Sequence, residues 1–127
     1  MALAPPMNFS MVAPGEYRSG FPTRHNLGFL RALGLRTLVR LEDAPYPEDL
    51  KLYINSAAIK VVDCLLEANK EPFLTSELQE FVVALSSMLD SRLHPVLVHS
   101  LRGQRRAGVL VGCYRKLHGW SLAAIFE

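Results

Sequence analysis

The stretch VLVHSLRGQRRAG, residues 96–108, contains residue types that could bind phosphate. It predicts an apolar strand, then a loop with three arginines and a glycine, then the start of a helix. Such a junction presents backbone N–H groups and the positive end of a helix dipole, and both favour an anion. Gly103 can turn the N–H groups inward, and the planar guanidinium of Arg106 can bind two phosphate oxygens. These residues indicate either a phosphate-binding loop or a solvated basic loop.

Ser100, at the start of this loop, carries a hydroxyl where a thiol would be the better nucleophile. A thiol would be activated there, because cations and helix N-termini lower its pKa from about 8.5 to roughly 3.5–7.5. A serine hydroxyl needs a base to take its proton, and His99 should point to the opposite face of the strand. The G-x-S-x-G elbow of hydrolases and the Walker pattern are both missing. The sequence therefore argues against serine-hydrolase chemistry.

The elements that must position this loop alternate between strands and helices. Strands are expected at 16–20, 36–41, 58–65 and 95–99, the last two of them buried. Helices are expected after Thr23 as far as Gly34, from Pro47 to Asn55, after Ser76, at 108–117 and from Ser121. The helix after Ser76 should bury one apolar face, made of Leu78, Phe81, Val82, Leu85, Met88 and Leu89.

This order predicts an α/β fold, in which ligands bind at the carboxyl ends of the strands. The chain has 127 residues, half of them apolar, which favours one domain over residues 16–127 after an extended lead-in at 1–15. A net charge of +2 is too small for a general nucleic-acid binder.

Nothing in the composition suggests a metal, a cofactor or a membrane span. The four histidines lack metal-ligand spacing, and the two cysteines lie far apart, outside any C-x-x-C pattern. No apolar run approaches the roughly 20 residues that span a membrane. We therefore expect an intracellular, cytoplasmic protein with reduced cysteines and no cofactor.

The loop resembles the H-C-x-x-G-x-x-R-[ST]-G signature of cysteine-dependent protein tyrosine phosphatases, with Ser100 in place of the cysteine. Four further stretches are similar to the plant-and-fungi-type atypical dual-specificity phosphatases, in particular their inositol-pyrophosphate phosphatase members. These stretches are NFSMVAPGEYRSGFPT (8–23), EDAPYPED (42–49), NKEPF (69–73) and GCYRKLHGWSLAAIFE (112–127). The resemblance implies a protein tyrosine phosphatase fold with a central, mostly parallel sheet flanked by helices. Relatives continue beyond Glu127, so the C-terminal helices are expected to be cut short.

The resemblance also implies roles for individual residues. Ser100 occupies the nucleophile position, Arg106 matches the phosphate-clamping arginine, and Lys70 would be a second cation facing the phosphates. His99 and Ala107 occupy supporting positions. The backbone of the loop would bind the phosphate through Leu101, Arg102, Gly103, Gln104, Arg105 and Arg106. A general acid could come from Asp63, Glu67 or Glu71, and the sequence does not choose among them. The ligand would be a phosphorylated small molecule or a phosphoprotein.

Two departures from the signature bear on activity. Ser100 replaces the cysteine, and Ala107 replaces a serine or threonine whose hydroxyl supports the thiolate. An engineered trapping change would alter one residue, whereas a natural pseudophosphatase would have lost several. Ala107 therefore favours a catalytically inactive domain that binds a phosphorylated ligand or partner. The alternatives are an active inositol-pyrophosphate or dual-specificity phosphatase captured as a Cys-to-Ser mutant, and a structural subunit of a larger protein or ribonucleoprotein assembly.

Overall fold

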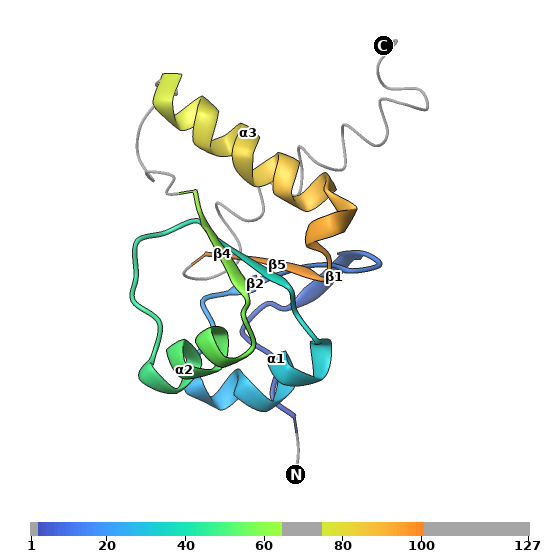
Figure 1. Ribbon diagram of the computed structural model, residues 1–127, viewed down its shortest axis with the longest axis vertical. Helices are drawn as coiled ribbons and strands as arrows, with labels where there is room; N and C mark the ends of the chain where they lie inside the picture. Colours follow the sequence, from blue (N-terminus) through green and yellow to red (C-terminus); the bar gives the residue numbers. More distant parts are fainter. Residues whose placement is uncertain (1–2, 65–74, 101–127) are drawn as a thin grey trace.

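The computed structural model describes residues 3–64 and 75–100 of the chain. Within them, five strands form one sheet in the order β1-β2-β5-β3-β4 (Figure 1). The strands are β1 (Ser10–Ala13), β2 (Glu16–Gly20), β3 (Thr37–Arg40), β4 (Lys60–Asp63) and β5 (Val96–Ser100). β1 runs antiparallel to β2, whereas all other neighbours are parallel. The mostly parallel sheet predicted from the sequence is confirmed, with β5 at its centre.

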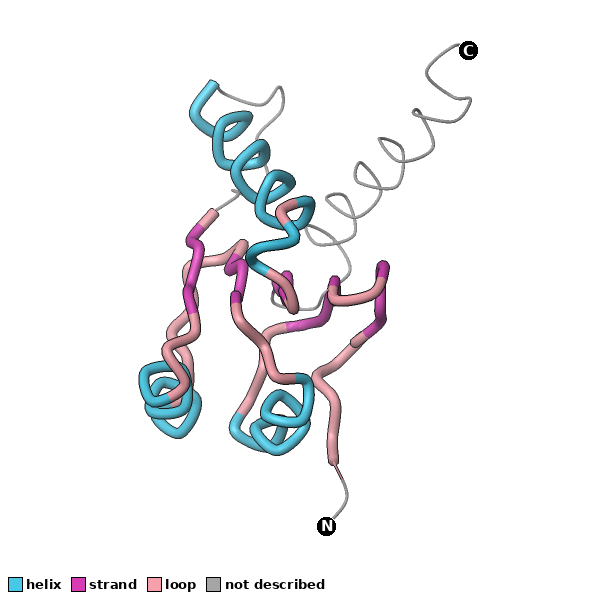
Figure 2. Tube along the Cα trace, turned by 45° about the vertical axis from the view of Figure 1, so that its right-hand side comes forward, coloured by secondary structure: helices cyan, strands magenta, loops and turns pink. Residues whose placement is uncertain are grey.

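Helices cover both faces of this sheet. α1 (Leu27–Leu33) and α2 (Glu48–Ser56) lie on one face, and α3 (Thr75–Leu89) lies on the other (Figure 2). Short 3-10 turns at Arg24–Asn26 and Ser91–Leu93 precede α1 and β5. Each connection between parallel strands contains a helix, because the chain must return to the other end of the sheet before it can pair in parallel.

The ends of the first two helices follow the signals read from the sequence. Gly34 ends α1 in the left-handed conformation, with φ of 64°, which a residue without a Cβ adopts at little cost. Pro47 directly precedes α2, which ends at Ser56, one residue beyond the predicted end. The predicted helices at 108–117 and from Ser121 lie outside the described residues.

The central strand β5 contributes to two apolar clusters, one on each face of the sheet. Leu97 packs with Leu30 and Leu38 in the cluster that α1 and α2 cover. Val96 and Val98 pack with Met88 of α3 on the other face. All five residues of β5 are buried. Packing from both faces therefore fixes the position at which β5 ends.

Two segments at the borders of the sheet differ from the sequence prediction. The lead-in at 1–15 contains β1, which pairs with β2 and so belongs to the sheet. β4 is shorter than the predicted strand at 58–65, and it lies at the sheet edge, where Lys60 and Asp63 are exposed. A short apolar run is compatible with a central or an edge strand, so the sequence pattern alone does not determine the place of β4 in the sheet.

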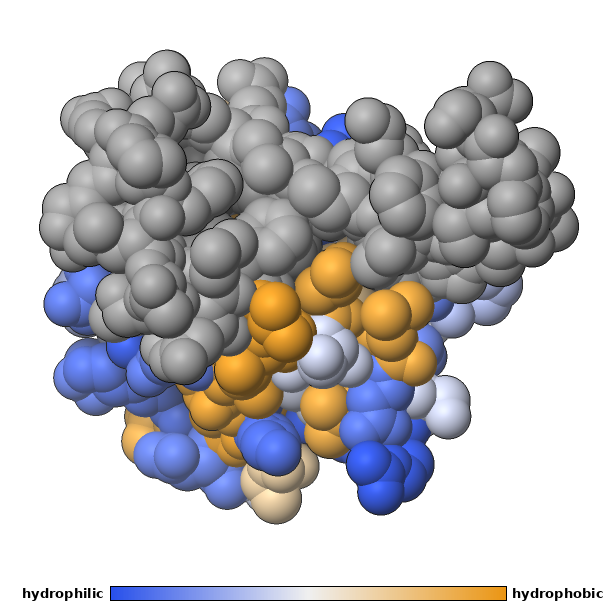
Figure 3. All heavy atoms as spheres, turned by 90° about the horizontal axis from the view of Figure 1, so that it is seen from above, coloured by the Kyte–Doolittle hydropathy of each residue, from blue (hydrophilic) through white to orange (hydrophobic). Residues whose placement is uncertain are grey.

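Over residues 82–89 of α3, the buried face agrees with the predicted one at Leu85 and Met88 and differs from it at other positions. The side chains of Leu78 and Phe81 lie outside the described residues. Ala84 and Met88 are fully buried, and Leu85 packs against their cluster. Val82 and Leu89, which the sequence assigned to the buried face, are 56% and 46% exposed. Apolar side chains also gather at the surface of the molecule seen from above (Figure 3). The prediction gave weight to large side chains and left out Ala84, whose small side chain meets the core together with Met88 and Leu85.

Leu97→Ala tests the central position of β5. The side chain is fully buried, and its truncation leaves a cavity, so the free energy of unfolding should fall by about 2–5 kcal/mol. Leu52→Ala is the matched control, because Leu52 is 65% exposed and its loss should change stability by less than about 0.5 kcal/mol. Urea denaturation followed by circular dichroism measures both, and equal effects would contradict the described core.

Candidate phosphate-binding site

The carboxyl ends of four parallel strands meet at one edge of the sheet. Gly20 at the end of β2 is the register partner of Ser100 at the end of β5. On the other side of β5, Arg40 is paired with His99 and, in turn, with Asp63. Ser100 is 1% exposed and His99 is completely buried. Ser100, the residue predicted to occupy the nucleophile position, therefore ends the central strand at the edge where α/β sheets bind ligands.

The structure describes three of the residues singled out in the sequence: Ser100, His99 and Asp63. The remaining candidates lie outside the described residues, namely Lys70, Glu67, Glu71, Leu101, Arg102, Gly103, Gln104, Arg105, Arg106 and Ala107. Their predicted roles stay predictions.

His99 lies within a cluster of aromatic rings. Its Nε2 is 2.7 Å from the hydroxyl oxygen of Tyr46, and the ring of Phe21 meets it edge-on with centroids 4.7 Å apart. Tyr46 packs with the cluster beneath α1 and α2, and side chains alternate along a strand, so Ser100 belongs to the opposite face. This agrees with the expectation that His99 points away from Ser100.

Burial determines the protonation of both members of this hydrogen bond. Desolvation, with a smaller contribution from the charge of Arg40, lowers the pKa of His99 to about 3. Burial likewise raises the pKa of Tyr46 far above its ordinary value. At neutral pH both groups are uncharged. His99 is therefore a neutral member of this aromatic cluster and contributes no positive charge to the edge of the sheet.

Arg40 connects three segments at the same edge. Its Nε donates to the Asp63 carboxylate on β4 at 2.7 Å, and its Nη1 donates to the carbonyl of Ala44 at 2.8 Å. The guanidinium also lies 5.8 Å from the centre of the Tyr46 ring. The hydrogen bond with Asp63 raises the pKa of Arg40. The contact with Arg40 occupies a carboxylate oxygen of Asp63, which argues for a structural role of this candidate acid.

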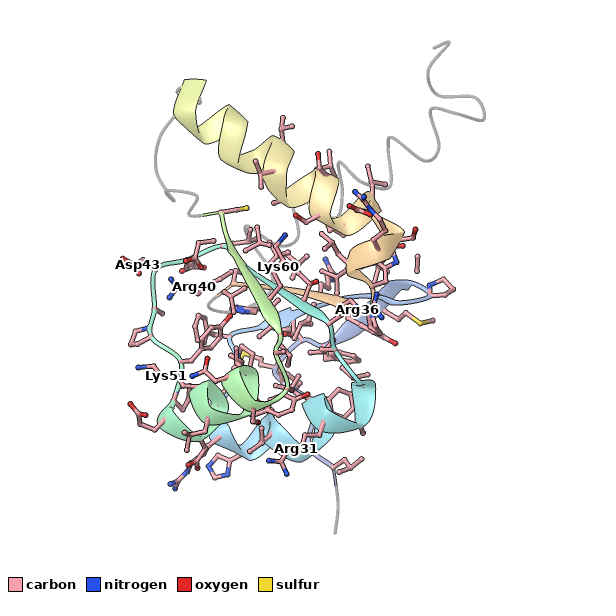
Figure 4. All side chains as sticks on the ribbon, in the orientation of Figure 1. Arg31, Arg36, Arg40, Asp43, Lys51 and Lys60 are labelled. Atoms are coloured by element: carbon pink, nitrogen blue, oxygen red, sulfur yellow. The ribbon has the colours of Figure 1, made fainter. Side chains whose placement is uncertain are left out.

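A pocket of about 450 Å³ adjoins Arg40 and Tyr46, beside α2. It is lined by Arg40, Pro45, Tyr46, Lys51, Ile54, Asn55 and Val61. Arg40 and Asp43 lie together at one end of the connection from β3 to α2, and Lys51 lies on α2 (Figure 4). The pocket shares the Tyr46 wall with the cluster around His99.

Comparison with known proteins decides the family. A model described as "Tyrosine phosphatase family" matches residues 3–127. The chain belongs to this family. Inositol diphosphatase DSP3 of Arabidopsis thaliana is 42% identical over 98% of this chain and 62% of its own length. Inositol diphosphatase SIW14 of Saccharomyces cerevisiae is 38% identical, over 97% of this chain and 44% of its own length. The chain spans about three fifths of the first relative and less than half of the second.

Solved structures of this tyrosine phosphatase family confirm the predicted fold. The catalytic core of Siw14 has a TM-score of 0.83 and 38% identity, over 99% of this chain and 75% of that one. A Cys-to-Ser variant of P. aeruginosa TpbA in complex with pTyr has a TM-score of 0.70 and 25% identity, over 94% of this chain and 70% of that one. The sheet and helices described above therefore have the protein tyrosine phosphatase fold.

Among residues 3–64 and 75–100, no group of three or more His, Cys, Asp or Glu side chains could hold a metal ion. Within the same ranges, no helix is long and apolar enough to cross a membrane.

Sequence reasoning missed Arg40, Tyr46 and Phe21 as parts of the site. The sequence predicts a turn at 43–49 and a strand at 36–41 that includes Arg40, and EDAPYPED carries only the family resemblance. An arginine near the end of one strand, Arg40, and a tyrosine in the following loop, Tyr46, could have indicated a contact at the carboxyl edge of the sheet. Their distances to His99 depend on the strand order, which a single sequence does not reveal.

The neutral state of buried His99 predicts a specific pH dependence of stability. Its pKa is about 3 in the folded chain and 6.5 ordinarily, so the unfolded chain takes up the proton first as pH falls. Its contribution to stability is complete above pH 6.5 and is lost progressively towards pH 3, at up to about 1.4 kcal/mol per pH unit. Urea denaturation between pH 7 and pH 4 should show a shallower loss for His99→Gln than for the wild type.

His25→Gln is the control for that experiment, because His25 is exposed. It should keep the wild-type slope. Equal slopes for His99→Gln and the wild type would contradict a neutral buried imidazole.

Proposed function

We propose that this chain is a phosphate-binding domain that does not turn over its ligand through a phosphocysteine, in other words a pseudophosphatase. The observation that carries the proposal is Ser100 itself, buried at the end of the central strand in the nucleophile position. Serine could act only with a base, and the adjoining His99 lies on the opposite face of the strand, with its Nε2 bonded to Tyr46. Its lowered pKa, about 3, also makes it a weak base. Loss of a nucleophile reduces turnover by a factor on the order of 10⁶ in a well-studied enzyme.

Two comparisons support the proposal that this chain still binds a phosphorylated ligand. The TpbA variant, in which serine replaces a cysteine, is in complex with pTyr, so a relative with such a change still binds a phosphorylated group. The plant and yeast relatives are named inositol diphosphatases, which favours an inositol carrying clustered phosphates as the ligand. A phosphorylated protein partner is the second ligand class that this site would accept.

The alternative is an active inositol-pyrophosphate or dual-specificity phosphatase whose cysteine has been exchanged for serine. The relatives named as diphosphatases favour it, whereas Ala107 favours the pseudophosphatase. The gene sequence at codon 100 distinguishes a natural serine from an engineered one.

Ser100→Cys separates these two functions by activity. The chain as it stands should show no turnover of p-nitrophenyl phosphate or of an inositol pyrophosphate, because no thiolate can attack phosphorus. If several catalytic groups have been lost, Ser100→Cys should also be inactive, and adding Ala107→Thr should not restore turnover. Robust hydrolysis by Ser100→Cys alone would favour the active phosphatase instead.

Arg106→Ala tests the binding claim. A charged hydrogen bond contributes about 1.5–3 kcal/mol, so removing the guanidinium should weaken binding of inositol hexakisphosphate about tenfold to a hundredfold. Isothermal titration calorimetry measures the dissociation constant. Arg92→Ala is the control, because this exposed arginine pairs with Asp90 just before β5, at the other end of the strand. Unchanged affinity of Arg106→Ala would remove the basis for a phosphate-binding loop.

A further inference from the structure

We propose that Tyr46 is a positioning residue of the phosphate site, whose hydroxyl fixes the ring orientation and the tautomer of His99. Its effect on ligand binding rests on the proposed function, whereas its effect on His99 does not. Tyr46 lies in the connection from β3 to α2, so the proposal links that loop to the end of β5.

Two rings from separate segments, those of His99 and Phe21, hold Tyr46 in place. Its ring centre lies 5.5 Å from that of His99 and 5.2 Å from that of Phe21, which follows β2. Phe21 also meets His99 edge-on, so each ring contacts the other two. The hydroxyl then lies 2.7 Å from His99 Nε2. Ring packing and the hydrogen bond therefore specify one position for the tyrosine.

Arg40 provides a second attachment for the same loop. It donates to the carbonyl of Ala44, two residues before Tyr46, and its guanidinium lies near the Tyr46 ring. Arg40 is also the register partner of His99 in the sheet. The loop is thus held by β3 through Ala44 and by β5 through Tyr46, whose hydroxyl adds a side-chain contact to the backbone hydrogen bond from Leu41 N–H to the carbonyl of His99.

The hydrogen bond also selects where the single imidazole proton resides. Nδ1 of His99 is buried, and no described residue is a hydrogen-bond partner for it. An unpaired buried N–H is rarer than an unpaired acceptor, so the proton belongs on Nε2, which donates to Tyr46, and Nδ1 keeps its lone pair. Tyr46 lines the pocket beside α2, which gives its own hydroxyl hydrogen access to water.

The backbone links the orientation of His99 to Ser100, the residue at the predicted nucleophile position. His99 directly precedes Ser100, and both residues are buried. In this proposal, a fixed imidazole holds the His99–Ser100 peptide in one position, and that peptide leads into the predicted phosphate-binding loop. His99 lies on the face opposite Ser100 and acts without touching the ligand.

Tyr46→Phe removes the hydroxyl and keeps the ring. In the wild type, ¹⁵N NMR of the His99 imidazole should show the proton on Nε2. In Tyr46→Phe the two nitrogens should move towards a mixture of tautomers, and affinity for inorganic phosphate, measured by NMR titration, should fall about threefold to tenfold. Tyr53→Phe is the matched control, because Tyr53 lies on α2 and packs with Arg31. It should leave the tautomer and the affinity unchanged.

The His99 tautomer and the phosphate affinity test separate claims, so each measurement can fail without the other. A His99 spectrum that is the same in Tyr46→Phe and the wild type would overturn the positioning role, as would a wild-type proton on Nδ1. A wild-type chain that binds no phosphate would overturn the proposed function, while the spectrum would still decide the role of Tyr46. A changed tautomer with unchanged phosphate affinity would also overturn the positioning role, because positioning requires both.

Discussion

The parallel pairing of β5 with β2 and β3 is the constraint on which the rest of the structure depends. It buries every residue of β5 and brings the ends of four strands to one edge. The two apolar clusters stabilise this arrangement from opposite faces, since alternate residues of β5 belong to each. The polar contacts of Arg40, Tyr46 and His99 form at that edge because the register places their backbones side by side.

The sequence was sufficient for the parts of the fold that local signals determine. Gly34 and Pro47 marked helix boundaries, and the apolar run after Pro95 predicted the central strand. The sequence pattern was insufficient where tertiary contacts determine the place or the orientation of an element. Whether β4 would be central or at the edge depends on the strand order, and the exposure of Val82 depends on how α3 is rotated against the sheet.

The candidate site, like the fold, has residues that the sequence predicts and residues that only the tertiary contacts reveal. Ser100 could be identified from its position after an apolar strand and before the arginine-rich loop, and the structure places it at the predicted edge. Tyr46 and Arg40 could not be assigned, because their roles arise from contacts across the sheet between residues far apart in sequence. A sequence motif indicates the residues expected to contact a ligand more readily than the residues that hold those residues in position.

The burial of Ser100 also has a consequence for how activity can change in this fold. Ser100 is 1% exposed, and serine and cysteine differ by a single atom. An exchange between them therefore changes the chemistry at the end of β5 with little change in side-chain volume, so the fold and the reactivity of this position can vary separately.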